Sequence, residues 1–250
     1  GDPAWASVAR PRTLTYAVGG EADGPAVDLR AVDIETNRSG TDFTLVYGGW
    51  RYPVDLPLVG AFNVENAVSA AGAALALGHE LSDVVARLRT APQVPGRLER
   101  VVDGRIPVLI DFAHTPDALA SVLWTLRPLV TGRLIVLFGA GGDRDVEKRP
   151  EMAAAVSRVA DLVVLTSDNP RTEDPEKILD DLEAGLGDVA RFREVDRRTA
   201  LRIAIGAAEP GDLVLLAGKG HERTQTIGAD KLVFDEAAIA RDASAARGAA

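Results

Sequence analysis

The chain has 250 residues, of which 46% are hydrophobic and 26% charged, an ordinary composition for a folded protein of one or two domains. Its net charge of −9 argues against general binding to nucleic acid or to anionic membranes, and no apolar run reaches the roughly 18 residues that a membrane span needs. Zero cysteines exclude disulfides, thiolate metal sites and a cysteine nucleophile, and they fit a reducing compartment such as the cytoplasm.

The first part of the chain predicts a β-sheet. Residues 27–34 alternate apolar and polar side chains, which is the period of a half-exposed strand. Gly48 and Gly49 separate two further strand-like runs and predict a β-hairpin. After an irregular start over residues 1–11, we expect an antiparallel patch of strands at residues 13–18, 27–34, 42–47 and 52–56.

The pattern then changes to helical spacing. Apolar residues and alanines recur along residues 63–77 at intervals of three and four, which predicts a helix. Asn63 or Asn66 is expected to cap its first turn, and Gly78 to follow its last turn. A second helix is expected over residues 81–88.

A short connection with two prolines and a glycine follows at residues 91–96, and we expect a domain boundary there. Beyond it, apolar strands alternate with helices. This pattern predicts an α/β, Rossmann-like domain with a mostly parallel sheet that is covered on both faces. The strands are expected at residues 106–110, 134–138, 162–165, 191–195, 212–216 and 231–234, and the helices at residues 116–129, 148–159, 175–186, 198–208 and 235–246, the last capped by Asp235.

Polar loops follow four of these strands, at residues 111–117, 139–145, 167–173 and 218–222. Because the carboxyl ends of parallel strands lie at one edge of a sheet, we expect the side chains of these loops to converge in one site. The loops carry both signs of charge, so the expected ligand is zwitterionic or multiply charged, such as an amino acid or a nucleotide with Mg²⁺. Glycines in two of the loops would let backbone N–H groups approach it closely.

The loop at residues 167–173 carries an amide, a proline and a guanidinium at successive positions, Asn169, Pro170 and Arg171. The guanidinium can pair with a carboxylate through two hydrogen bonds, and the proline keeps Asn169 extended. The alternative is an ordinary surface turn, in which Asp and Asn side chains bond their own backbone. The position of the loop after a buried strand, beside three other charged loops, favours a binding site.

Several common catalytic motifs are absent from the sequence. It contains no G-x-x-x-x-G-K-[ST] phosphate loop, no G-x-S-x-G elbow and no H-E-x-x-H zinc pair, and we expect no metal site within this chain. The glycines of residues 139–142 lack the third glycine of the dinucleotide fingerprint, which disfavours a nicotinamide oxidoreductase.

Three short motifs, in this order along the chain, resemble those of the Mur ligase family. Residues 58–67, L-V-G-A-F-N-V-E-N-A, are similar to the family's G-x-F-N-x-x-N segment. Residues 95–99, P-G-R-L-E, are similar to its P-G-R-x-E segment. Residues 111–116, D-F-A-H-T-P, are similar to D-Y-A-H-T-P, with phenylalanine in place of tyrosine. Each motif alone is unspecific, but the combination is highly specific and covers nearly the whole chain.

The resemblance implies part of an ATP site. By motif position, Asn63 and Asn66 would lie near the adenine, Arg97 would contact the phosphates and Asp111 would hold the ribose.

The resemblance also implies which amino acid the loops bind. The D-N-P-R form at residues 168–171 is associated in the family with meso-diaminopimelate, the third residue of the peptidoglycan stem peptide. Two guanidiniums would bind its distal carboxylate, while a carboxylate and a backbone carbonyl would accept from its distal ammonium. The residues at these motif positions are Arg144, Asn169, Arg171, Gly218 and Glu222.

The implied reaction is ATP-driven formation of an amide. A carboxylate of the substrate UDP-MurNAc-L-Ala-D-Glu would be phosphorylated to an acyl phosphate, which the amine of diaminopimelate would attack. Lys148 is expected to contact the transferring phosphate. His114 is expected to be the second catalytic residue, with His221 the other candidate for the base that deprotonates the amine.

Large parts of the family pattern have no counterpart here. These are the N-terminal UDP-binding domain, the phosphate loop and most of the Mg²⁺ ligands, and the chain begins at Gly1 without an initiator methionine. We therefore expect a piece of a longer, monomeric, cytoplasmic ligase that is inactive by itself. Residues 1–94 would be the end of the central ATP-binding domain, and residues 95–250 the amino-acid-binding domain.

Three alternatives stay open. The first is a non-catalytic module that binds an amino acid or a nucleotide. The second is a ligase of the same family that adds L-lysine or L-ornithine. The third is a relative that adds glutamate to folate, although the loop with Asn169 and Arg171 argues against it.

Overall fold

A computed structural model describes residues 13–20 and 26–248, so the irregular segment expected at residues 1–11 lies outside the described residues. The chain divides into two compact units, Gly1–Pro92 and Gln93–Ala250, and the division falls inside the connection at residues 91–96. Among the described residues, none of the helices has the length and apolar character needed to cross a membrane.

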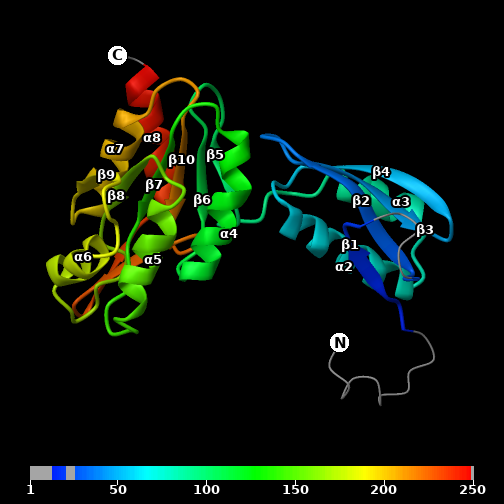
Figure 1. Cartoon of the computed structure of the whole chain (residues 1–250), viewed down its shortest axis with the longest axis horizontal. Helices are drawn as coiled ribbons and strands as arrows, with labels where there is room; N and C mark the ends of the chain where they lie inside the picture. Colours follow the sequence, from blue (N-terminus) through cyan, green and yellow to red (C-terminus); the bar gives the residue numbers. More distant parts are fainter. Residues whose placement is uncertain (1–12, 21–25, 249–250) are drawn as a thin grey trace. The chain divides into compact units, whose positions relative to one another are not determined.

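The sheet of the first unit contains, in spatial order, β1 (Tyr16–Val18), β2 (Leu29–Thr36), β3 (Thr41–Tyr47) and β4 (Trp50–Leu56) (Figure 1). β2, β3 and β4 are antiparallel, and the predicted hairpin joins β3 to β4 through Gly48 and Gly49, both with positive φ. The prediction of a wholly antiparallel patch is wrong, because β1 pairs with β2 in parallel. The alternation of polar and apolar side chains is the same for either strand direction, so it could not decide this pairing.

Two helices pack on this sheet, α2 (Ala61–Ala76) and α3 (Leu81–Leu88). The prediction that Asn63 or Asn66 caps α2 is wrong, because the N-cap is Gly60 and no side chain caps the helix. Asn63 lies within the first turn, is buried, and donates from Nδ2 to the carbonyl of Val59 at 2.9 Å. Gly78 follows the last turn with a φ of 90°, as predicted.

The second unit is built on a six-stranded sheet in the order β5-β6-β10-β7-β8-β9. All neighbours pair in parallel except β5, an unpredicted short edge strand that is antiparallel to β6. The predicted α/β fold with a mostly parallel sheet is therefore confirmed. The strands are β5 (Glu99–Val102), β6 (Val108–Asp111), β7 (Leu134–Phe138), β8 (Leu162–Leu165), β9 (Ala190–Arg193) and β10 (Leu213–Ala217).

Helices cover both faces of this sheet, α4, α5 and α6 on one side and α7 and α8 on the other (Figure 1). Asp235 caps α8 as predicted, since its Oδ1 accepts from the N–H of Ala238 at 3.0 Å. The helices are α4 (Pro116–Leu126), continued by the 3₁₀ turn η1 (Arg127–Leu129), α5 (Lys148–Ser157), α6 (Pro175–Glu183), α7 (Arg197–Ala207) and α8 (Glu236–Gly248).

The core of the second unit explains why its strands read as continuous apolar runs. Every residue of β7, β8 and β10 is buried, because helices cover both faces. One set of alternate side chains, including Ile110, Leu137 and Leu216, packs against α7 and α8. The register pairs Leu215 with both Leu109 and Val136, so the carboxyl ends of β6, β10 and β7 lie side by side.

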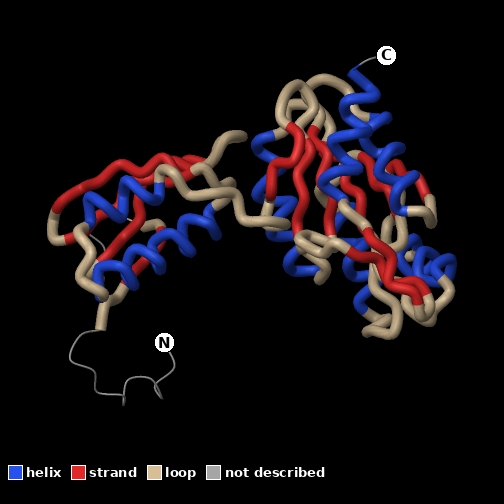
Figure 2. The backbone as a smooth tube through the Cα atoms, turned by 180° about the vertical axis from the view of Figure 1, so that it is seen from behind, coloured by secondary structure: helices blue, strands red, loops and turns tan. Residues whose placement is uncertain are grey.

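The last predicted strand does not join the main sheet. It is β12 (Asp230–Val233), which forms an antiparallel hairpin with β11 (Thr224–Ile227), a strand that the sequence did not predict (Figure 2). The hairpin touches the rest of the unit through a parallel bridge between Ile227 and Arg171. It therefore lies against the loop that follows β8.

Candidate functional site

A pocket of about 410 Å³ lies at the carboxyl ends of β6, β10, β7 and β8, which are neighbours in the sheet. This volume is in the range of small-molecule sites, and the position is where parallel sheets bind ligands. The pocket is lined by Phe112, His114, Thr115, Ala140, Gly141, Arg144, Asp145, Lys148, Arg149, Met152, Asp168, Asn169, Arg171, Gly218 and Glu222.

The structure brings seven of the eleven predicted site residues together in this pocket. They are Arg144, Asn169, Arg171, Gly218, Glu222, Lys148 and His114. Asp111 and Arg97 belong to the same unit but do not line the pocket. Asn63 and Asn66 belong to the first unit, whereas all the residues that line this pocket belong to the second.

The loop after β7 and the loop after β8 are in direct backbone contact. The N–H of Gly142 donates to the carbonyl of Asn169 at 2.9 Å, and Arg171 returns a hydrogen bond from Nη1 to the carbonyl of Gly142 at 2.5 Å. A Cβ at position 142 would overlap the carbonyl oxygen of Pro170, so glycine permits this approach. The contact aligns the two arginine-bearing loops along one side of the pocket.

The hairpin of β11 and β12 holds the loop after β8 from the other side. The N–H of Arg171 donates to the carbonyl of Thr226 at 3.1 Å, and the N–H of Gly228 donates to the carbonyl of Arg171 at 2.6 Å. The backbone of Arg171 has a φ of 52°, in the left-handed region that non-glycine residues seldom adopt. These two hydrogen bonds stabilise that conformation, which sets the direction of the Arg171 side chain.

Asn169 and Glu222 form a hydrogen-bonded pair inside the pocket, although they come from different loops. Asn169 Nδ2 donates to Glu222 Oε2 at 3.0 Å. Asn169 Oδ1 accepts from the N–H of Thr226 at 2.9 Å and from Lys219 Nζ at 3.2 Å. Asn169 is buried, whereas the Glu222 side chain is 36% exposed. The Asn169 side chain is therefore held in place, while the Glu222 side chain is accessible from the pocket.

Arg144 is available to an anionic ligand, whereas the guanidinium of Arg171 already donates from Nη1 to the carbonyl of Gly142. Arg144 is exposed, and no partner for its guanidinium is found in the described part of the chain. Beside it, Asp143 is tied to Thr172, whose hydroxyl donates to Asp143 Oδ1 at 2.7 Å. This hydrogen bond and the backbone N–H of Thr172, helped by the two arginines, hold the pKa of Asp143 below its usual value. The neighbouring carboxylate thus stays ionised and directed toward Thr172.

His114 and Phe112 form the other end of the pocket. His114 is exposed, its Nδ1 lies 2.6 Å from the carbonyl oxygen of Phe112, and the two rings meet edge to face. The guanidinium of Arg97 lies 5.2 Å from the centre of the Phe112 ring, which is a cation–π distance. Phe112 therefore links the pocket to Arg97, which itself does not line it.

Asp111 is buried and already hydrogen-bonded. Its two oxygens accept from the N–H groups of Leu98 and Ala113, both at 2.8 Å. Burial raises the pKa of Asp111, and these hydrogen bonds and the nearby charge of Arg97 oppose the shift without cancelling it. In this structure the carboxylate connects the loop after β6 to residue 98, and its role toward ribose stays a prediction.

Lys148 lies at the start of α5, where its Nζ is 3.3 Å from Asp145 Oδ2 in a half-exposed ion pair. An ion pair with this exposure is weak, so the ammonium can exchange partners at low cost. Within the described ranges, no group of three or more His, Asp or Glu side chains is arranged to hold a metal ion.

A larger cavity of about 830 Å³ lies in the first unit beside α2 and α3. Alanine, valine and leucine form most of its lining. The pocket with convergent polar groups is the better candidate for a functional site.

Comparison with known proteins gives the same family for both units. Residues 96–220 match the family model described as the glutamate ligase domain of the Mur ligases, and residues 2–74 match the Mur ligase middle domain. The chain belongs to the Mur ligase family.

Several curated Mur ligases are similar along most of this chain. UDP-N-acetylmuramoyl-L-alanyl-D-glutamate–2,6-diaminopimelate ligase of Trichormus variabilis is 50% identical over 222 residues, which cover 87% of this chain and 45% of that protein. The ligase of the same name from Gloeobacter violaceus is 47% identical over 226 residues, which cover 89% of this chain and 46% of that protein. The chain thus spans about half the length of the relatives it matches.

Two solved structures of similar proteins share the fold along most of this chain. A UDP-N-acetylmuramoyl-L-alanyl-D-glutamate–2,6-diaminopimelate ligase superimposes with a TM-score of 0.70 at 38% identity, covering 98% of this chain and 50% of that one. The folylpolyglutamate synthase of Mycobacterium tuberculosis, complexed with ADP and AMPPCP, superimposes with a TM-score of 0.63 at 25% identity, covering 76% of this chain and 45% of that one.

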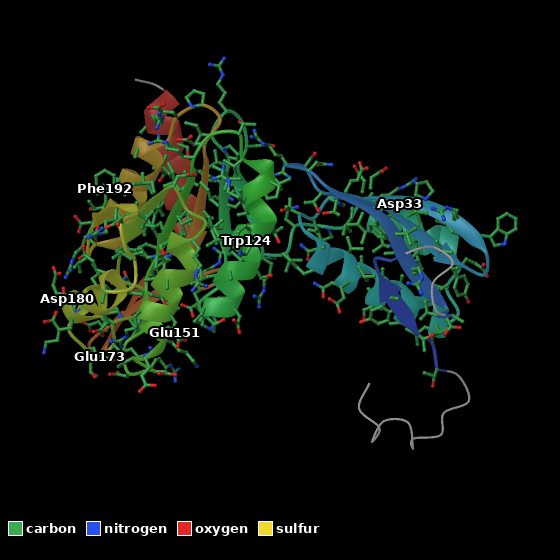
Figure 3. The ribbon with its side chains drawn as sticks, viewed as in Figure 1. Asp33, Trp124, Glu151, Glu173, Asp180 and Phe192 are labelled. Atoms are coloured by element: carbon green, nitrogen blue, oxygen red, sulfur yellow. The ribbon has the colours of Figure 1, made fainter. Side chains whose placement is uncertain are left out.

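Two cations of this Mur ligase site are buried, which sequence reasoning did not predict. Arg149 is 2% exposed and lines the pocket, where its Nη2 donates to both oxygens of Glu173 at 2.9 Å and its Nη1 to Asp181 at 2.8 Å (Glu173 is labelled in Figure 3). Lys219 is fully buried behind Asn169. The sequence offers no signal for either, because arginine and lysine in polar loops are normally solvated.

Proposed function

We propose that this chain is the C-terminal half of an ATP-dependent ligase that adds meso-diaminopimelate to UDP-N-acetylmuramoyl-L-alanyl-D-glutamate. The ligase would form an amide through an acyl phosphate, as a monomer in the cytoplasm. One observation carries the proposal, namely that all five residues expected to bind the amino acid line a single pocket. The names of the similar ligases from T. variabilis and G. violaceus support the same substrate.

The pocket suits an amino acid with a charged group of each sign at its far end. Arg144 and Arg171 can bind a carboxylate, because each guanidinium has several N–H donors in a planar fork. Glu222 and the carbonyl of Gly218 can accept from an ammonium at the other side of the pocket. The distal carbon of diaminopimelate carries both groups.

This arrangement would disfavour lysine. Lysine has the ammonium but no distal carboxylate, so it would leave the two guanidiniums without the anion that replaces their water. Each unpaired polar group costs roughly 1–3 kcal/mol, which corresponds to a preference of about 5- to 150-fold per group. Two guanidiniums that lose their partner together give strong selectivity.

The remaining predicted residues belong to the phosphate side of the reaction. Lys148 would offer its ammonium to the transferring phosphate, after leaving its weak pair with Asp145. His114 would take the proton of the attacking amine. Arg97 and Asp111, with Asn63 and Asn66 of the other unit, would contribute to the ATP site. ATP binding and acyl phosphate formation need the phosphate loop, which this sequence lacks.

The proposal is tested by ligation assays on the complete enzyme that carries this chain, with Arg171→Ala and Arg144→Ala variants. We expect the KM for diaminopimelate to rise about 10- to 100-fold in each variant, because each loses charge-assisted hydrogen bonds. The KM for ATP should be unchanged. Arg158→Ala is the matched control, since Arg158 is an exposed arginine at the end of α5 that does not line the pocket.

Either of two results would refute the proposal. One is a wild-type enzyme that prefers lysine or ornithine over diaminopimelate in the same assay. The other is an unchanged KM for diaminopimelate in both arginine variants. Calorimetry of the 250-residue chain with diaminopimelate and with ATP additionally separates a chain that binds these ligands from an inert one.

A further inference from the structure

Lys219 is a fully buried lysine directly behind the amino-acid pocket, and its own side chain does not line that pocket. Lysine is almost never buried completely unless its charge is paired. Here the ammonium donates to the carbonyl of Thr224 at 2.9 Å and to Asn169 Oδ1 at 3.2 Å. It also lies 3.2 Å from Asp168 Oδ1 and 3.5 Å from Glu222 Oε2. The buried ammonium of Lys219 thus contacts the loop at residues 167–173 and the loop at residues 218–222.

The first consequence concerns the orientation of the Asn169 amide. An ammonium and a backbone N–H can only donate, and both the Lys219 ammonium and the N–H of Thr226 point at the same atom of Asn169. That atom must be the oxygen, so the amide nitrogen faces Glu222 and the pocket. One hydrogen of Nδ2 goes to Glu222, and the second has no acceptor among the residues that the structure describes, which leaves it for a ligand carboxylate.

The second consequence concerns Glu222. Its Oε2 is held by Asn169 Nδ2 at 3.0 Å and by the Lys219 ammonium at 3.5 Å. Its Oε1 accepts no hydrogen bond from any residue that the structure describes, so this oxygen is left for a ligand ammonium. Lys219 also compensates the charges of Asp168 and Glu222, which would otherwise repel each other and separate.

We propose that Lys219 is a positioning residue for amino-acid selection. It holds Asn169 and Glu222 so that they present one N–H donor and one carboxylate oxygen side by side. Such a pair matches the carboxylate and ammonium on the distal carbon of the incoming amino acid. The inference rests on the proposed function, and adds to it a residue that acts through Asn169 and Glu222 without touching the ligand.

The test compares Lys219→Met and Lys219→Gln with wild type in the complete ligase. Methionine fills similar volume without charge or donor, and glutamine keeps a neutral donor. We expect Lys219→Met to raise the KM for diaminopimelate on the order of 10- to 100-fold, with a smaller rise for Lys219→Gln. The preference for diaminopimelate over lysine should fall, while kcat at saturation and the KM for ATP change little.

Lys177→Met is the matched control, because Lys177 is an exposed lysine on α6 that does not line the pocket. It should leave every constant at the wild-type value. If Lys219→Met does not fold, Lys219→Gln decides alone, since it keeps a hydrogen bond to Asn169 or Thr224.

The outcomes separate the inference from the proposed function. A folded Lys219 variant with unchanged KM and unchanged amino-acid preference overturns the inference. An equal loss in kcat, in the KM for ATP and in the KM for diaminopimelate also overturns it, because a merely structural lysine would do this. A wild-type enzyme that prefers lysine refutes the proposed function itself, before any variant is compared.

Discussion

Arg149 offers a quantitative test of how the pocket is held together. Its buried guanidinium joins three segments, since it donates to Glu173 after β8, to Asp181 on α6 and to the carbonyl of Gly141 after β7. Glu173 in turn accepts a hydrogen bond from the N–H of Asp143, which precedes Arg144 in the loop after β7. Replacing Arg149 with methionine removes these connections while keeping an apolar side chain in the space.

The expected loss of stability follows from the exposure of the partners. Removing one member of a fully buried ion pair costs about 3–5 kcal/mol, because the other charge is left without water. The side chains of Glu173 and Asp181 are 28% and 37% exposed, so water can replace much of the guanidinium. In addition, Nε of Arg149 is buried without a hydrogen-bond partner, and the substitution removes that cost. We expect a net destabilisation of about 2 kcal/mol.

The assay must report on the second unit alone. Amide hydrogen exchange in β7 and β8 does so, because these strands lie in the core of that unit and adjoin the loops that Arg149 connects. Arg158→Met on the same helix is the control and should change the free energy of unfolding by less than about 0.5 kcal/mol. A change as small as this for Arg149→Met would refute the reasoning, since it would mean that solvent fully replaces the buried guanidinium.

Two further predictions concern pH and loop geometry. Burial alone would raise the pKa of Asp212, but hydrogen bonds from Arg133 and from the N–H of Glu209 outweigh it and hold the pKa below its usual value. This stabilisation is complete above the unfolded pKa of about 3.9 and is lost as pH falls through the lower folded pKa. Below about pH 4, the urea midpoint of unfolding should therefore fall more steeply with decreasing pH in wild type than in Asp212→Asn. Parallel curves of midpoint against pH for the two proteins would contradict this. Gly142→Ala should lower the affinity for diaminopimelate about tenfold or more, because the added Cβ overlaps the Pro170 carbonyl and separates the two arginine loops. Calorimetry checks it, with Gly206→Ala on α7 as a control at a site with open space and without a positive φ, and equal affinities for Gly142→Ala and wild type would contradict it.

The loop with Asn169 and Arg171 could be recognised from sequence because it combines a local and a topological signal. The buried run before it predicts a strand, and the rule that parallel strands end at one edge predicts that four polar loops meet. Both inferences are confirmed, since the loops line one pocket. The specific roles of all eleven predicted site residues, in binding the amino acid, in binding ATP and in catalysis, remain predictions.

The errors have separate physical causes. α2 begins at Ala61 without a side-chain cap, because Asn63 turns inward to bond the carbonyl of Val59. β1 joins its neighbour in parallel, although its pattern suits either direction. The hairpin of β11 and β12 carries few buried residues, so its hydrophobic pattern gave little signal.

The sequence by itself determined the α/β class, the order of the second unit's helices and of its five parallel strands, and which loops carry charge. These follow from the spacing of apolar residues, which are local properties of the chain. Only the tertiary structure decided that Lys219 and Arg149 are buried and that the amide of Asn169 faces Glu222. Burial and amide orientation depend on which donors and acceptors the fold brings within about 3 Å, and Glu222 and Thr226, which orient the Asn169 amide, lie more than fifty positions from it in the sequence.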